Sequence, residues 1–124
     1  MNQDTNKSEK IIIPIIIQSL NQTLRQHWGA KSRTKKKYKE LISKQMLINR
    51  IKKTDVAVRW NVTITSYRKR LLDKDNLIGG AKSLLDSLCD EGFIFDDTPD
   101  MVNVRYYQKI SKSKEYYTEI TRSR

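Results

Sequence analysis

The most constraining feature of this sequence is a segment of alternating character, residues 56–67, that lies between two segments with helical spacing. Apolar residues stand at every second position of it, from Val56 through Trp60 to Ile64, with mostly polar residues between them. This pattern predicts a half-buried strand. Apolar residues recur every three to four positions in residues 34–53 and again in residues 76–91, which predicts two amphipathic helices.

The remaining chain adds three further strands and an irregular segment. The β-branched run 10–19 predicts a strand, with Pro14 favouring an edge or a bulge, and residues 101–110 and 116–121 predict two more. The polar and basic residues 21–32 are expected to form an ordered loop. The predicted order is β-α-β-α-β-β, an α+β fold with one mixed sheet.

The length of 124 residues corresponds to a single domain. Residues 1–9 are polar and are predicted to form a flexible N-terminus, which leaves residues 10–124 as the folded domain. The longest apolar run, residues 11–17, is too short to cross a bilayer and lacks a cleavage site for secretion. We therefore predict a cytoplasmic protein.

The charge of the chain points to a polyanionic partner. There are 25 Lys and Arg against 14 Asp and Glu, a formal net charge of +11, and such an excess is typical of proteins that bind nucleic acid. A soluble charged surface or a ribosome-associated basic protein is the alternative. The single cysteine, Cys89, excludes an internal disulfide and a Cys-rich zinc site, and the single histidine, His27, excludes a His-pair metal motif.

The acidic residues are concentrated in one part of this basic chain. Eight of the 14 lie between Asp73 and Asp100. Carboxylates repel DNA unless a cation such as Mg²⁺ lies between them and a phosphate. Asp73 and Asp75 stand two residues apart after the alternating strand, so they can project to the same side. Each acidic motif also has a structural interpretation, a helix N-cap for Asp75 and a surface turn for the loop around Asp97.

The acidic motifs occur in a specific order. Asp73-Lys74-Asp75-Asn76-Leu77 precedes an amphipathic helix, and Gly92-Phe93-Ile94-Phe95-Asp96-Asp97 follows it. This arrangement resembles the RusA family of Holliday junction resolvases, which are small homodimeric endonucleases, mostly of phages and prophages, that cut four-way DNA junctions with Mg²⁺. The resemblance covers most of the chain from about Ile11 and is specific between Asp73 and Asp97. The segment that contains Gly79-Gly80 is longer than in the family pattern.

The resemblance implies roles for individual residues. Asp73, Asp75 and Asp97 would be the catalytic metal ligands for Mg²⁺, for which Mn²⁺ would substitute. Lys82 would be the catalytic lysine that neutralises charge at the phosphate, and Asp96 and Asp86 would be accessory residues. Read as an ordinary helix surface, Lys82 and Asp86 would instead form an i,i+4 ion pair.

Contacts to DNA are expected from basic and polar residues in three segments. These are the run just before the acidic site, the start of the first predicted helix and the loop before it: Arg68, Lys69, Arg70, Arg33, Lys35, Lys36, Lys37, Arg25, His27 and Asn21. Trp28 would either stack on an unpaired base or pack over the sheet, with packing favoured. Trp60 is expected in the core.

Together these features predict a magnesium-dependent endodeoxyribonuclease that resolves four-way junctions in recombination and repair. Two symmetric cuts require two equivalent active sites, which a C₂ homodimer provides. One alternative is a nuclease for another branched DNA, such as a flap or a fork. The other is a basic junction-binding protein without catalytic activity.

Overall fold

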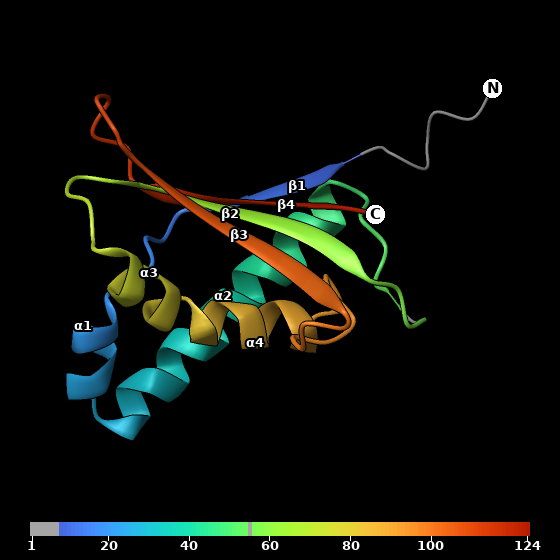
Figure 1. Cartoon of the computed structure of the whole chain (residues 1–124), viewed down its shortest axis with the longest axis horizontal. Coiled ribbons are helices and arrows are strands. Elements are labelled where there is room, and N and C mark those ends of the chain that lie inside the picture. Colours follow the sequence, from blue (N-terminus) through green and yellow to red (C-terminus); the bar gives the residue numbers. More distant parts are fainter. Residues whose placement is uncertain (1–7, 55) are drawn as a thin grey trace.

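One four-stranded sheet forms the body of the protein, and its helices lie on one face of that sheet (Figure 1). The structure is a computed structural model that describes residues 8–54 and 56–124. Its strands are β1 (Glu9–Ile13), β2 (Trp60–Arg68), β3 (Val102–Ile110) and β4 (Tyr117–Ser123), in the spatial order β1-β4-β2-β3. Strand β4 is antiparallel to both β1 and β2, whereas β2 and β3 are parallel.

The core lies between the sheet and the helices. Inward-facing side chains of the strands, among them Trp60 and Ile64, pack against the long helix α2 (Trp28–Ile48) and against α4 (Lys82–Asp90). Two short helices, α1 (Leu20–Arg25) and α3 (Lys74–Gly80), complete the layer. Burial of this apolar surface is the main force that stabilises the fold. The predicted α+β class, single domain and mixed sheet are confirmed.

The predicted order of the four strands and two main helices is confirmed, with an additional helix, α1, before the first of them and a division of the second into α3 and α4. The loop predicted over residues 21–32 is wrong, because this segment contains α1 and the first turn of α2. Ser19 starts α1, since its hydroxyl accepts a hydrogen bond from the backbone N–H of Gln22 at 3.0 Å. Helix α2 spans Trp28–Ile48, so it begins and ends earlier than the helix predicted over residues 34–53.

The second predicted helix is interrupted at Ala81. Helix α3 begins at Lys74, earlier than predicted, and Ala81, with φ −82° and ψ −3°, separates it from α4. Gly80 lies directly against the backbone carbonyl of Gln18, so closely that no side chain would fit there. The interruption therefore occurs where the helix contacts the segment that leads into α1.

Strand boundaries differ from the predictions where tertiary structure intervenes. Strand β1 ends at Ile13, just before Pro14, and it forms one edge of the sheet, where proline is tolerated. Strand β2 begins only at Trp60, and Val56 is 55% exposed. Of the predicted flexible N-terminus, residues 1–7 lie outside the described residues, whereas Glu9 belongs to β1 and pairs with Arg122 at 3.0 Å.

Within the described part of the chain, no helix is long and apolar enough to span a membrane.

Candidate metal and DNA-binding site

Asp73 occupies the N-cap of α3, shortly after the carboxyl end of β2. Its Oδ1 accepts a hydrogen bond from the backbone N–H of Asn76 at 2.8 Å, and its Oδ2 accepts one from the Asn76 side-chain amide at 3.2 Å. The N-cap predicted for the Asp75-Asn76 motif is therefore supplied by Asp73 instead. A carboxylate oxygen accepts more than one hydrogen bond or ligand, so Asp73 retains the capacity to bind a cation.

Asp75 lies in the first turn of α3, exposed to solvent. The N-terminus of a helix favours negative charge, and Asp75 is the acidic residue in this first turn. It forms no ion pair with any lysine or arginine in residues 8–54 and 56–124. Two such carboxylates suit Mg²⁺, which is commonly bound by one or two carboxylates and completes its octahedron with water and phosphate oxygens.

The segment that precedes α3 is held by Gln108 of β3. The Gln108 side chain donates to the carbonyl of Leu72 at 2.6 Å and accepts from the N–H of Leu72 at 2.9 Å. The side-chain amide thus pairs with both backbone polar groups of Leu72, as a neighbouring strand would, and fixes the residue directly before Asp73. The sequence gives no local signal for this role, since Gln108 stands in a strand whose other polar residues face solvent.

Replacement of Gln108 by leucine should disturb Asp73 more than it disturbs the fold. The two hydrogen bonds together make a net contribution of about 1–3 kcal/mol to stability. Their loss leaves the backbone of Leu72 free to move. We expect lower thermal stability and, in a cleavage assay, a raised Mg²⁺ requirement. The matched control is Gln26→Leu, because the Gln26 side chain makes no hydrogen bond within the described residues. Equal behaviour of both variants would contradict the positioning role.

The start of α1 contacts the start of α3. The backbone N–H of Asn21 donates to the Asn76 side-chain oxygen at 3.3 Å, and Asn76 in turn contacts Asp73. Asn21 therefore lies beside the candidate metal ligands. Arg25 and His27 are exposed near the end of α1, and Trp28 is 80% exposed. The favoured interpretation of Trp28 as a packing residue is wrong, whereas Trp60 does lie in the core at 6% exposure.

A second acidic group surrounds Cys89 at the end of α4. Burial raises the pKa of the Cys89 thiol, and the charges of Asp96, Asp97, Asp90 and Asp86 raise it further. The thiol contacts the carbonyl of Phe95 at 3.5 Å, and the Asp96 carboxylate accepts from the N–H of Asp97 at 2.8 Å. Asp97 and the accessory residues Asp86 and Asp96 thus belong to this group.

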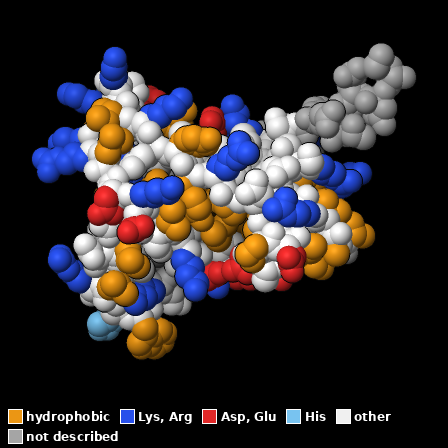
Figure 2. Space-filling view, viewed as in Figure 1, with side chains coloured by type: hydrophobic (Ala, Val, Ile, Leu, Met, Phe, Trp, Pro, Cys, Tyr) orange, Lys and Arg blue, Asp and Glu red, His pale blue; other side chains and the backbone are white. Residues whose placement is uncertain are grey.

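The two acidic groups are separate on the surface. Figure 2 shows acidic side chains over α3 and, at a distance, over the end of α4 and the loop that follows it. Across residues 8–54 and 56–124, no three His, Cys, Asp or Glu side chains converge to hold a metal ion. The predicted three-aspartate site is therefore not assembled in this structure. The reason is that α4 leads away from α3, and Asp97 returns only beyond its far end.

Lys82 is the first residue of α4 and is exposed. It forms no ion pair in the described part of the chain, so the i,i+4 pair with Asp86 is absent. Because of the interruption at Ala81, Lys82 lies in α4 and Asp75 in α3, so the two residues do not share one continuous helix. Lys82 nevertheless lies two residues beyond the end of α3, between the two acidic groups along the chain.

Arg68 is the clearest correction among the predicted DNA contacts. Only 7% of it is exposed, and its guanidinium donates to the carbonyls of Ile17 and Arg70 at 2.6 and 2.9 Å. Burial lowers the pKa of Arg68, an effect that Tyr38 opposes. Arg68 is therefore an internal residue that joins β2 to the segment after β1. Its neighbours Lys69 and Arg70 are exposed.

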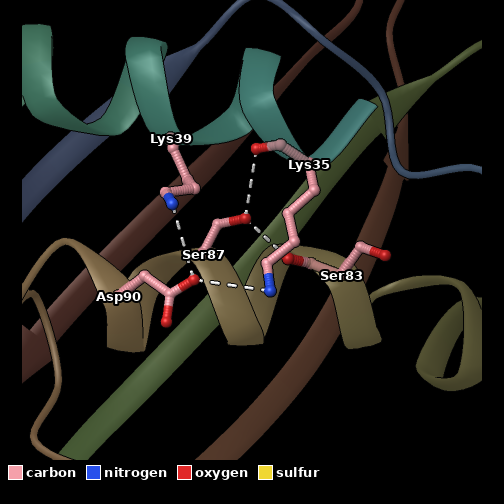
Figure 3. Close-up of polar contacts among 5 residues, drawn as sticks. All are labelled: Lys35, Lys39, Ser83, Ser87 and Asp90. Atoms are coloured by element: carbon pink, nitrogen blue, oxygen red, sulfur yellow. Dashed lines mark hydrogen bonds and ion pairs between the residues drawn. The ribbon is translucent and has the colours of Figure 1, made fainter. Parts of the chain in front are cut away.

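Among the predicted lysines of α2, Lys35 contacts α4 rather than pointing freely outward. The amines of Lys35 and Lys39 lie 3.4 and 3.8 Å from the Asp90 carboxylate (Figure 3). The Ser87 hydroxyl of α4 lies 2.8 Å from the backbone carbonyl oxygen of Ser83, to which it donates, and 3.5 Å from the backbone carbonyl oxygen of Lys35. These exposed pairs contribute little stability. Arg33, Lys36 and Lys37 remain exposed on α2.

A comparison of the chain with models of known protein families finds no match, and a comparison with curated proteins finds no significant relative.

Proposed function

We propose that this protein is a magnesium-dependent, structure-specific endodeoxyribonuclease that resolves four-way DNA junctions. The observation that carries the proposal is the pair Asp73 and Asp75, two exposed carboxylates at the start of α3 in a chain of net charge +11. Asn76 forms hydrogen bonds with Asp73, and Gln108 holds the backbone of Leu72 directly before it. Its motif is the part of the sequence that resembles the RusA family.

The chemistry of the pair fits the proposed ion. Asp73 and Asp75 would hold Mg²⁺, which supplies an activated water and charge neutralisation at the phosphate when bound. Asp97 is the third ligand by resemblance, and its distance from the pair makes Asp73 and Asp75 the primary ligands here. Exposed Lys82 would stabilise negative charge that develops on the phosphate.

The cations around the pair support a DNA substrate. Lys69 and Arg70 precede Asp73 in the chain, and Asn21 and Arg25 extend along α1 beside α3. None of these three basic side chains pairs with an acid within the described residues. They would bind the phosphates that flank the cut, and a C₂ homodimer would supply the second cut.

Removal of one of these charges should reduce the salt dependence of DNA binding. Each phosphate contact adds about one unit to the slope of log K against log salt. Lys69→Gln and Arg70→Gln should each lower the slope by about one, whereas Lys52→Gln, in the segment that follows α2, should leave it unchanged. Binding is measured by fluorescence anisotropy at several salt concentrations. A change of slope in the Lys52 variant alone would contradict the proposed DNA contacts.

One assay decides between the proposed function and its alternatives. The protein is incubated with a synthetic four-way junction, a flap and a plain duplex, each with Mg²⁺ or with EDTA. Cleavage of the junction that requires metal supports the proposal, and preferential cleavage of the flap supports a different branched substrate. Tight junction binding without cleavage in either Mg²⁺ or Mn²⁺ would instead identify a non-catalytic binding protein.

A further inference from the structure

A cavity of about 490 Å³ opens between the segment after β1, helix α1 and helix α2. Its walls are mostly apolar, with Ile15, Ile16 and Tyr38 among the lining residues. The cavity also has two cations, Arg33 and Lys37, which form no ion pair within residues 8–54 and 56–124. An apolar space with cations beside it fits a ligand that has a flat apolar part and an anionic part.

The hydroxyl of Tyr38 lacks a partner. Tyr38 is only 2% exposed, and within the described residues its hydroxyl makes no hydrogen bond. Burial raises its pKa to about 12, although the charge of Arg68 opposes the shift, so the group remains a neutral donor. The hydroxyl is not fully enclosed, since among the described residues only Trp60 Nε1 is both buried and unpaired, so a ligand in the cavity can reach it and form a hydrogen bond with it. The amides of Gln18 and Gln22 offer further donors and acceptors at the same wall.

The wall of the cavity is fixed before any ligand arrives. The Thr118 hydroxyl donates to the carbonyl of Ile15 at 2.6 Å, and Arg68 donates to that of Ile17 at 2.6 Å. On its other side the same segment meets Gly80 of α3. A preformed wall reduces the entropy cost of binding, and its contact with Gly80 joins it to the end of α3, the helix that starts at the candidate metal ligands.

We infer that this cavity binds a single nucleotide, with the base against Ile15, Ile16 and Tyr38 and the phosphate on Arg33 and Lys37. The ligand is either an unpaired nucleotide of branched DNA or a free mononucleotide. The first source rests on the proposed function, because a branched substrate supplies unpaired bases beside the cut. Its base would leave the stack, at a cost that is lowest where the base is already unpaired.

The test measures binding in EDTA, so that it is independent of cleavage. The full chain is titrated with a duplex that carries one unpaired 2-aminopurine, with the fully paired duplex, and with dAMP. We expect tighter binding of the unpaired duplex and a change in 2-aminopurine fluorescence. A response to dAMP without a preference for the unpaired duplex would assign the cavity to a free nucleotide, which still supports nucleotide binding.

Variants separate the cavity from general electrostatics. Ile16→Trp should fill the cavity and abolish the preference for the unpaired nucleotide, while paired-duplex binding persists. Tyr38→Phe should weaken binding of the nucleotide by about 2–10-fold, the effect of one hydrogen bond, without lowering the thermal midpoint. Arg33→Gln should weaken it more than Lys44→Gln, which removes an equal charge elsewhere on α2.

Two results would overturn the inference. One is an absence of both the unpaired-base preference and dAMP binding in the unaltered protein. The other is a preference that Ile16→Trp and Arg33→Gln leave intact. Either result can occur in a protein that still cuts junctions with Mg²⁺. Conversely, a protein that does not cut junctions can still prefer the duplex with an unpaired nucleotide. Failure of the cavity and failure of the proposed nuclease function are therefore distinguishable.

Discussion

Asp75→Asn should abolish metal-dependent junction cleavage and leave junction binding intact or stronger. The substitution preserves the size of the side chain but removes the negative charge that a magnesium ion requires. Loss of a residue that only supports a metal ligand commonly costs 10–100-fold, so loss of a ligand should exceed about 100-fold in rate. DNA binding should not suffer, because a charge that repels phosphate has been removed.

The matched control for this variant is Asp100→Asn, which removes one exposed carboxylate from the loop after α4. It should cut at the normal rate. Rates are compared on the same labelled four-way junction under single-turnover conditions, with binding measured separately in EDTA. Normal cleavage by Asp75→Asn would show that the ligand assignment is wrong.

Gly80→Ala should give the largest loss of stability among small substitutions in α3. A Cβ at Gly80 would overlap the carbonyl oxygen of Gln18 and lie 2.8 Å from its carbon, both backbone atoms that cannot move aside. Forced overpacking costs about 1–3 kcal/mol and sometimes more. Because Gln18 precedes the capping residue of α1, the same change should also displace Asn21 from Asn76.

The neighbouring Gly79→Ala variant is the control. The three atoms nearest to a Cβ there all belong to the side chain of Leu20, at 2.9–3.0 Å; its two methyl groups can turn away, and its Cβ must shift slightly. The better helix propensity of alanine, by up to about 1 kcal/mol, should offset that contact. Urea denaturation of the two variants measures the difference. Equal free energies of unfolding would contradict the close packing of α3 on this segment.

The fold was largely predictable because apolar and polar residues alternate along its strands and its long helix has an apolar stripe. Strands β3 and β4 were predicted to within two residues at each end. Helix α1 was missed because four of its six residues are polar and it buries no side chain completely. The break at Ala81 was also missed, because it depends on a contact between Gly80 and a segment far away in sequence.

The candidate site was predictable in composition but not in geometry. The burial of Arg68 follows from the alternation of β2, since Arg68 shares the inward face with Trp60 and Ile64. The charge of the run Arg68-Lys69-Arg70 favoured a DNA contact for all three residues, which is wrong for Arg68. The separation of Asp97 from Asp73 depends on the direction of α4, which spacing along the chain does not fix. The roles of Gln108 and Tyr38 arise only from tertiary contacts.

The central claim is tested most directly by mapping the cuts in a synthetic four-way junction. Each of the four strands is end-labelled in turn, and the protein is added with Mg²⁺ or with EDTA. The proposed function predicts nicks at symmetric positions in two opposing strands near the branch point, with Mg²⁺ only. Junction binding without any nick, or cleavage that persists in EDTA, would contradict it.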